Sequence, residues 1–142
     1  MVENNTFVQQ YEIKGWDFTR AGEASCEIKN ILKEIGTPPE IIRRVAIATY
    51  EAEMNIVMYA KHGVIHCLID PHYICITLED QGPGIADINR ALEEGFSTAT
   101  PEIREMGFGA GMGLPNIKRN SDSFHITSEI GSGTKLEMKF YL

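Results

Sequence analysis

Two residues that could do chemistry lie four positions apart in a stretch with helical periodicity, Glu51 and Asn55. At this spacing two side chains lie one helical turn apart on the same face. The carboxylate could orient a water or a hydroxyl group, and the amide oxygen is a hard ligand of the kind that Mg²⁺ prefers. A solvated helix edge is the alternative interpretation of this pair. Glu53 falls on another face of the same helix, where we expect it to be solvated.

A second candidate is the run from Gly107 to Leu114, in which four glycines alternate with other residues. Glycine permits positive φ and lets backbone N–H groups approach a ligand closely. Pro115 then favours a helix start, and a helix N-terminus attracts phosphate. The spacing matches neither a P-loop, since the chain has no Gly-Lys pair, nor a dinucleotide fingerprint. A flexible loop is the alternative.

Two strand ends add polar groups to these candidates. Alternation puts Asp80 on the same strand face as the apolar Leu78, and Thr134 on the same face as Leu136. A carboxylate turned toward the core needs donors, because its desolvation is costly. Gly82, in the turn that follows, leaves room for a flat ligand whose amino group could donate to Asp80. An aspartate that caps its own turn, and an ordinary strand threonine, are the alternatives.

The elements that must position these residues follow from periodicity and from turn residues. We expect a strand over 7–14 and a helix that begins at Asp17 or Thr19 and ends at Gly36. Pro38 and Pro39 open a longer helix, which should end at Gly63. The remaining elements are a hairpin of 64–69 and 72–80, a short helix over 86–94, a loop from Gly95, a helix over 115–120, and strands over 124–128 and 134–141. This order predicts one domain over 1–142 in the α+β class, a two-layer sandwich with helices on one face of a mixed, mostly antiparallel sheet.

Composition limits the classes of function. The chain has 142 residues and a net charge of −7, which argues against nucleic acid as a partner. We expect no signal peptide and no membrane span, because no apolar run approaches the ~20 residues that a span needs. The three cysteines have no Cys-x-x-Cys spacing, which fits a cytoplasmic location. Buried strand cysteines are favoured over a metal site built from His66, Cys67, His72 and Cys75.

Together, these motifs resemble those of the GHKL or Bergerat-fold ATPases. The four boxes occur in the family's order as Glu51-x-x-x-Asn55, Asp80-x-Gly82-x-Gly84, Gly109-x-Gly111-x-Gly113-Leu114 and Gly131-x-Gly133-Thr134. Their spacing covers nearly the whole chain, and four boxes in order are more specific than any one. The short length is similar to that of the small bacterial serine/threonine kinases of partner-switching pathways, which include anti-sigma factors and stressosome switch kinases.

The resemblance implies a role for each matching residue. Glu51 would be the general base that activates a substrate hydroxyl, and Asn55 a ligand of Mg²⁺. Asp80 would bind the adenine amino group of ATP, with Gly82, Gly84 and Thr134 beside it. Residues 95–108 would form a mobile ATP lid. The other expected nucleotide contacts are Ser97, Thr98 and Arg104 in the lid, and the backbone amides of Gly109, Ala110, Gly111, Met112, Gly113 and Leu114.

The resemblance also implies partners and leaves alternatives open. A kinase of this kind would phosphorylate a STAS-domain antagonist and bind a sigma factor or a PP2C-type phosphatase. A second hypothesis is a nucleotide-gated binding module whose own catalysis is dispensable, and a homodimer stays open. A sensor histidine kinase is a weaker alternative, since no His precedes Glu51. A protein that binds no nucleotide would gain no thermal stability from Mg-ATP.

Overall fold

The computed structural model describes residues 6–93, 101 and 113–142, and these residues form a sheet of five strands in the order β1-β2-β3-β5-β4. The strands are β1 (Phe7–Lys14), β2 (His62–Ile69), β3 (Tyr73–Asp80), β4 (Ser123–Glu129) and β5 (Gly133–Tyr141). Each neighbouring pair is antiparallel. The predicted α+β class is confirmed, and among the described strands no pair is parallel, so the mixed character that we expected does not occur there.

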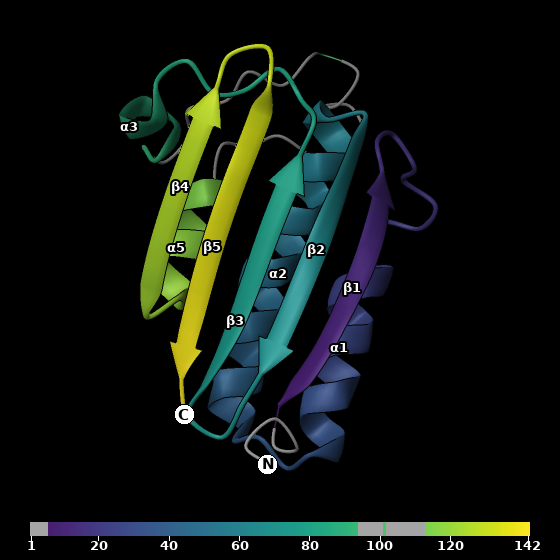
Figure 1. Ribbon diagram of the computed structural model, residues 1–142, viewed down its shortest axis with the longest axis vertical. Helices are drawn as coiled ribbons and strands as arrows, with labels where there is room; N and C mark the ends of the chain where they lie inside the picture. The colour runs from purple at the N-terminus through teal and green to yellow at the C-terminus, as the bar shows by residue number, and fades with distance from the viewer. Residues whose placement is uncertain (1–5, 94–100, 102–112) are drawn as a thin grey trace.

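The helices are α1 (Glu23–Glu34), α2 (Pro39–Tyr59), α3 (Ile88–Ala91) and α5 (Gly113–Asn120). Figure 1 shows α1, α2 and α5 side by side on one face of the sheet. The core fills the space between these two layers, where the fully buried side chains include Leu32, Val45, Ile76, Ile117 and Phe140. The predicted sandwich, with its helices on one face, is thus confirmed.

Turn residues set some of the boundaries as the sequence predicts. Gly36 has a φ of +81° directly after α1. Its N–H donates to the Lys33 carbonyl, and the N–H of Thr37 donates to the Leu32 carbonyl, which is the Schellman pattern of a helix C-terminus. Pro39 opens α2 as its first residue. The hairpin around Asp70 is also confirmed, and the predicted first strand, β1, lies at an edge of the sheet.

Other boundaries differ from the prediction. Helix α1 begins at Glu23, not near Asp17 or Thr19, and its N-cap is Gly22. Helix α2 ends at Tyr59, and Gly63 belongs to β2, where a β-carbon would lie 2.8 Å from the Ile56 side chain. The glycine therefore serves close packing of helix against strand, not helix termination. Helix α3 covers only 88–91 of the expected 86–94, and α5 begins two residues before Pro115.

Glu53 explains the start of α1, and here the prediction of a solvated side chain is wrong. The Glu53 side chain is only 1% exposed. Its Oε2 accepts the N–H of Gly22 at 2.9 Å, and its Oε1 accepts the N–H of Ser25 at 3.0 Å and the Ser25 hydroxyl at 2.8 Å. Gly22 has no side chain to cap the helix, so a carboxylate from α2 satisfies the first free N–H groups of α1.

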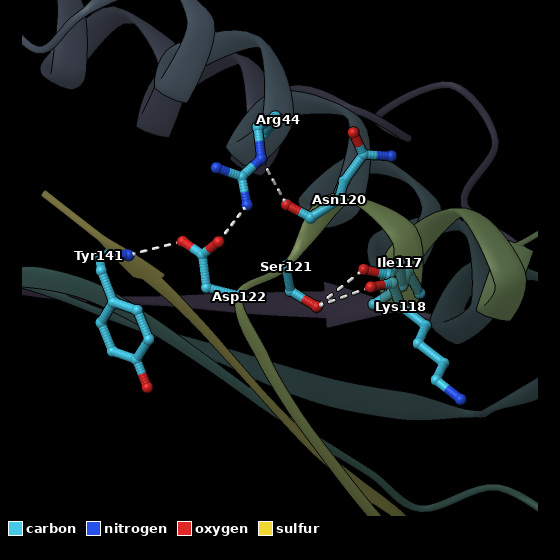
Figure 2. Close-up of polar contacts among 7 residues, drawn as sticks. All are labelled: Arg44, Ile117, Lys118, Asn120, Ser121, Asp122 and Tyr141. Carbon is cyan, nitrogen blue, oxygen red and sulfur yellow. Dashed lines mark hydrogen bonds and ion pairs between the residues drawn. The ribbon is translucent and has the colours of Figure 1, made fainter.

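The C-terminal end of α5 and the residues directly after it are fastened to α2 and β5 (Figure 2). Arg44 of α2 donates from Nε to the Asn120 carbonyl at 3.0 Å and from Nη2 to Asp122 at 2.7 Å. Asp122 also accepts the N–H of Tyr141 on β5 at 2.8 Å. A cation at the last carbonyls of a helix is favourable. These contacts fix where α5 lies on α2, and hence where its N-terminal end lies.

Candidate functional site

The N-terminal end of α5 lies against the two candidate residues of α2. A β-carbon on Gly113 would lie 3.3 Å from Asn55 Oδ1 and 3.5 Å from Glu51 Oε2. A side chain at Gly113 would therefore meet the Asn55 amide oxygen tightly and the Glu51 carboxylate at ordinary contact distance. The structure brings together Glu51, Asn55 and the last glycine of the alternating run, which are separated by 58 to 62 residues in the sequence.

The Glu51 carboxylate is partly shielded from water. Its burial raises the pKa above the ordinary value of a glutamate, and a hydrogen bond with the Asn116 side chain lowers the pKa by less. In the part of the chain that the structure describes, no Lys or Arg forms an ion pair with it. A carboxylate whose pKa is raised in this way is a better proton acceptor at neutral pH than an exposed one.

Asp80 lies at the end of β3 and faces the helical layer, as alternation predicts. Its Oδ1 accepts the N–H of Gly82 at 2.9 Å and the N–H of Thr134 at 3.3 Å. Burial raises the pKa of Asp80, and these two N–H donors lower it by less. Both contacts end on Oδ1, and Oδ2 accepts no hydrogen bond from the described residues. Oδ2 therefore remains as an acceptor for a ligand's amino group.

A serine that the sequence did not point to completes this corner. The Ser128 hydroxyl of β4 lies 2.9 Å from the Thr134 hydroxyl and 2.7 Å from the N–H of Ile85, from which it accepts a hydrogen bond. Gly84 has a φ of +80°, and a β-carbon there would collide with the Glu129 carbonyl. The turn after β3 is thus held against the end of β4 by contacts that only glycine permits at this position.

A depression of about 340 Å³ opens at the same end of the sheet. Asp80, Ser128 and Thr134 line it, together with residues of the opposite sheet face such as Glu79 and Lys135, which form an exposed ion pair at 3.5 Å. Glu51 and Asn55 do not line it. The depression therefore coincides with only the Asp80 end of the predicted site.

The remaining predicted contacts divide into two groups. Leu114 is buried, so its side chain packs in the core, and only its backbone could face a ligand. Seven predicted residues lie outside the described part of the chain: Ser97, Thr98, Arg104, Gly109, Ala110, Gly111 and Met112. The predicted ATP lid over 95–108 lies outside it as well, except for residue 101.

The Asn55 side chain fits the Mg²⁺ ion that the sequence implies. Mg²⁺ usually keeps several waters and takes few protein ligands beside phosphate oxygens, so a single amide oxygen from Asn55 is a sufficient set. Among the described residues, no three His, Cys, Asp or Glu side chains lie close enough to hold a metal ion by themselves. Of the two strand cysteines, Cys67 is fully buried and Cys75 is partly buried. No described helix has the length and apolar character that a membrane span requires.

Comparison with known proteins identifies the class. Residues 17–140 match the histidine kinase-like ATPase domain, so the chain belongs to this family. It is 36% identical over 126 residues to the serine/threonine-protein kinase RsbT of Bacillus subtilis (strain 168), an alignment that covers 86% of each chain. It is 29% identical over 121 residues to the anti-sigma F factor of Clostridium acetobutylicum, covering 82% of this chain and 81% of that protein.

A solved structure supports the fold alone. The SiaB–SiaC complex of Pseudomonas aeruginosa contains a chain that superposes with a TM-score of 0.64 at 14% sequence identity, and the match covers 93% of this chain and 88% of that one. The resemblance inferred from the four sequence boxes is therefore confirmed at the level of the family and the fold. The roles of the individual site residues stay predictions.

Proposed function

We propose that the chain is an ATP-dependent serine/threonine protein kinase of a bacterial partner-switching pathway. Its substrate would be a STAS-domain antagonist, and its regulated partner a sigma factor or a PP2C-type phosphatase. The observation that carries the proposal is the position of Gly113, where a β-carbon would lie within 3.5 Å of both Asn55 and Glu51, because the N-terminal end of α5 then lies beside the proposed metal ligand and the proposed base. The proposal is supported by membership of an ATPase family and by 36% sequence identity to a protein kinase, in an alignment that covers 86% of the chain.

The chain's own groups suffice for phosphoryl transfer, which asks mainly for positioning and charge stabilisation. Glu51 would accept the proton of the substrate hydroxyl as that oxygen bonds to the γ-phosphorus and the bond to the bridging oxygen of ADP breaks. Asp80 would hold the adenine amino group through Oδ2. The backbone N–H groups at the N-terminal end of α5 would face the phosphates. Mg²⁺, held by Asn55, would supply positive charge at the phosphate oxygens.

Replacement of Glu51 tests this proposal. A STAS-domain protein from the same genome is incubated with labelled Mg-ATP and either the native chain or Glu51→Gln. We expect transfer to fall by roughly 10²- to 10⁴-fold, which is the usual contribution of a general base. The nucleotide Kd should stay the same, since this change keeps the shape of the side chain. Glu34→Gln, on the exposed surface of α1, is the matched control, and undiminished transfer by Glu51→Gln would contradict the role of Glu51.

A second candidate is a nucleotide-gated binding module, which the similarity to anti-sigma F factors favours. In this case ATP or ADP would set the affinity for a protein partner, and transfer would be dispensable. Partner affinity that depends on the nucleotide and survives Glu51→Gln supports the module. Affinity that does not depend on the nucleotide contradicts it.

A further inference from the structure

The Ser128 hydroxyl on β4 has three polar neighbours at the Asp80 end of the site. Its oxygen accepts the N–H of Ile85, in the turn after β3, at 2.7 Å. The hydroxyl donates to the Gly133 carbonyl at 3.1 Å and lies 2.9 Å from the hydroxyl of Thr134, the residue opposite Ser128 in the β4–β5 ladder. Asp80, Ser128 and Thr134 line the same depression. One serine therefore joins the turn, the end of β5 and the wall of the depression.

The number of protons in this network decides which way the two hydroxyls point. Each hydroxyl has one proton to donate and two lone pairs that accept. If Ser128 donates to the Gly133 carbonyl, Thr134 can donate to Ser128, and all three contacts of Ser128 are hydrogen bonds. If Ser128 donates to Thr134 instead, the hydrogen bond to Gly133 is lost. The first arrangement is favoured, because it makes one hydrogen bond more among partly buried groups.

Thr134 then offers only lone pairs to a ligand. Its proton is used by Ser128, and its hydroxyl has no other partner among the described residues. The Asp80 carboxylate is also an acceptor, and both of its described N–H contacts end on Oδ1, not on Oδ2. A purine with a 6-amino group brings donors to such a pair of acceptors. A purine with a 6-oxo group would bring a carbonyl, whose lone pairs would oppose those of Thr134 and Asp80.

We propose that Ser128 is a positioning residue that fixes the Thr134 hydroxyl as an acceptor and thereby selects 6-amino over 6-oxo purine nucleotides. This inference rests on the proposed function, because it assumes that a purine nucleotide binds beside Asp80. Ser128 acts through Thr134 and makes no contact with the base in this role. What it contributes is the direction of one proton, which distinguishes this role from simple support of the turn.

Nucleotide binding tests the inference without a transfer reaction. ATP and inosine triphosphate (ITP) differ at the 6-position and in the proton on N1, so the ratio of the ITP Kd to the ATP Kd measures the selection. Isothermal titration with Mg²⁺ and no protein substrate should give a ratio well above one for the native chain. In Ser128→Ala the Thr134 proton is released and can be donated to the 6-oxo group. We therefore expect the ratio to fall by roughly 5- to 10-fold, which corresponds to one hydrogen bond.

Two other serine variants distinguish proton direction from support of the turn. Ser132→Ala is the matched control, because this exposed serine lines the same depression, and the ratio should stay at the native value. Ser128→Thr keeps a hydroxyl that both donates and accepts, so it should retain most of the native ratio. If Ser128 only supported the turn, Ser128→Ala would weaken ATP and ITP by the same factor and leave the ratio unchanged.

Thr134→Val tests the direction of the proton independently, and it remains informative if Ser128→Ala does not fold. This change keeps the approximate shape of the side chain and removes the hydroxyl. If the hydroxyl is an acceptor, its loss weakens ATP more than ITP, and the ratio falls. If it donates to the ligand, ITP is weakened more and the ratio rises. Because Ser128 acts through Thr134, adding Ser128→Ala to Thr134→Val should not change the ratio further.

These measurements separate the inference from the proposed function. An unchanged ratio in Ser128→Ala, or a higher ratio in Thr134→Val, would overturn the role of Ser128 while ATP binding by the native chain still supports the kinase. Equal affinity of the native chain for ATP and ITP would have the same consequence. A native chain that binds neither nucleotide would overturn both.

Discussion

Glu51 and Glu53 lie two residues apart on α2 and have opposite surroundings. Glu53 is 1% exposed, and both of its oxygens accept hydrogen bonds from the first turn of α1. Glu51 faces α5 and is only partly buried, and no Lys or Arg among the described residues pairs with it. Two residues correspond to about 200° of helix rotation, so the same side chain meets different neighbours. A fully satisfied carboxylate fastens two helices, whereas an under-satisfied one beside a glycine can still accept a proton.

The largest effect on stability should follow from Glu53→Ala. It leaves the N–H groups of Gly22 and Ser25 without their acceptor, and the Ser25 hydroxyl with only the Gly22 carbonyl at 3.2 Å. We therefore expect the free energy of unfolding to fall by about 3 kcal/mol. Urea denaturation measures this loss. Ser25→Ala, which removes only the hydroxyl, should cost about 1 kcal/mol and stays measurable if the first variant does not fold. Glu34→Ala is the control, and a loss in Glu53→Ala no larger than in the control would show that the contacts do not stabilise the chain.

The same pair shows what the sequence could and could not predict. Helical periodicity placed Glu51 and Asn55 on one face correctly, since that relation is local. The partners of Glu53 lie 28 and 31 residues earlier in the chain, and no local pattern reports which helix packs on that side. One signal was available, because Glu53 stands between Ala52 and Met54 in an apolar stretch.

The strand ends were predictable in more detail. Alternation along β3 and β5 placed Asp80 and Thr134 on the buried side, and the antiparallel pairing of these strands brings the two together. To predict the role of Ser128, one would have to know the register of β4 against β5, which the sequence does not specify. The order of the boxes followed from the resemblance, whereas only the structure shows that a β-carbon at Gly113 would lie within 3.5 Å of both Glu51 and Asn55.

A carboxylate at the opposite end of α5 contrasts with Glu51, because it has a basic partner. Asp122 is paired with Arg44 at 2.7 Å. Burial alone would raise the pKa of Asp122, but the N–H of Tyr141 and the Arg44 guanidinium together lower it below the ordinary value. Arg44→Ala removes this pair and the donor to the Asn120 carbonyl, and we expect the free energy of unfolding to fall by roughly 1 to 2 kcal/mol.

Thermal unfolding at neutral pH measures the Arg44 effect, and Arg43→Ala, an exposed neighbour of the same type, is the matched control. Equal stability of the two variants would contradict the fastening of α5 by Arg44. A further consequence concerns Glu51. If this end positions α5, Arg44→Ala should also lower transfer, although by less than Glu51→Gln, which replaces the proposed base itself.

The smallest expected change in stability is a gain, at Asp80. Because the folded-state pKa of this carboxyl is raised, its contribution to stability is fully present below the unfolded value of about 3.9 and is lost as the pH rises through the folded value. At neutral pH the charged form is therefore less favourable than a neutral side chain of the same shape. Asp80→Asn keeps an oxygen for the N–H groups of Gly82 and Thr134, so we expect a higher Tm without ligand.

The same variant should bind adenine nucleotides more weakly. If the amide oxygen of the substituted side chain keeps the two backbone donors of Oδ1, the amide nitrogen takes the place of Oδ2, which was the acceptor for the ligand. Thermal shift with and without millimolar Mg-ATP measures both effects in one series, since a ligand stabilises the native state according to its affinity. The expected result is a raised Tm alone and a smaller increment with Mg-ATP. A lower Tm without ligand would mean that charged Asp80 is needed for the turn itself. An unchanged increment would remove Asp80 from the adenine pocket, and the contrast between fastening and binding carboxylates would then rest on Glu51 alone.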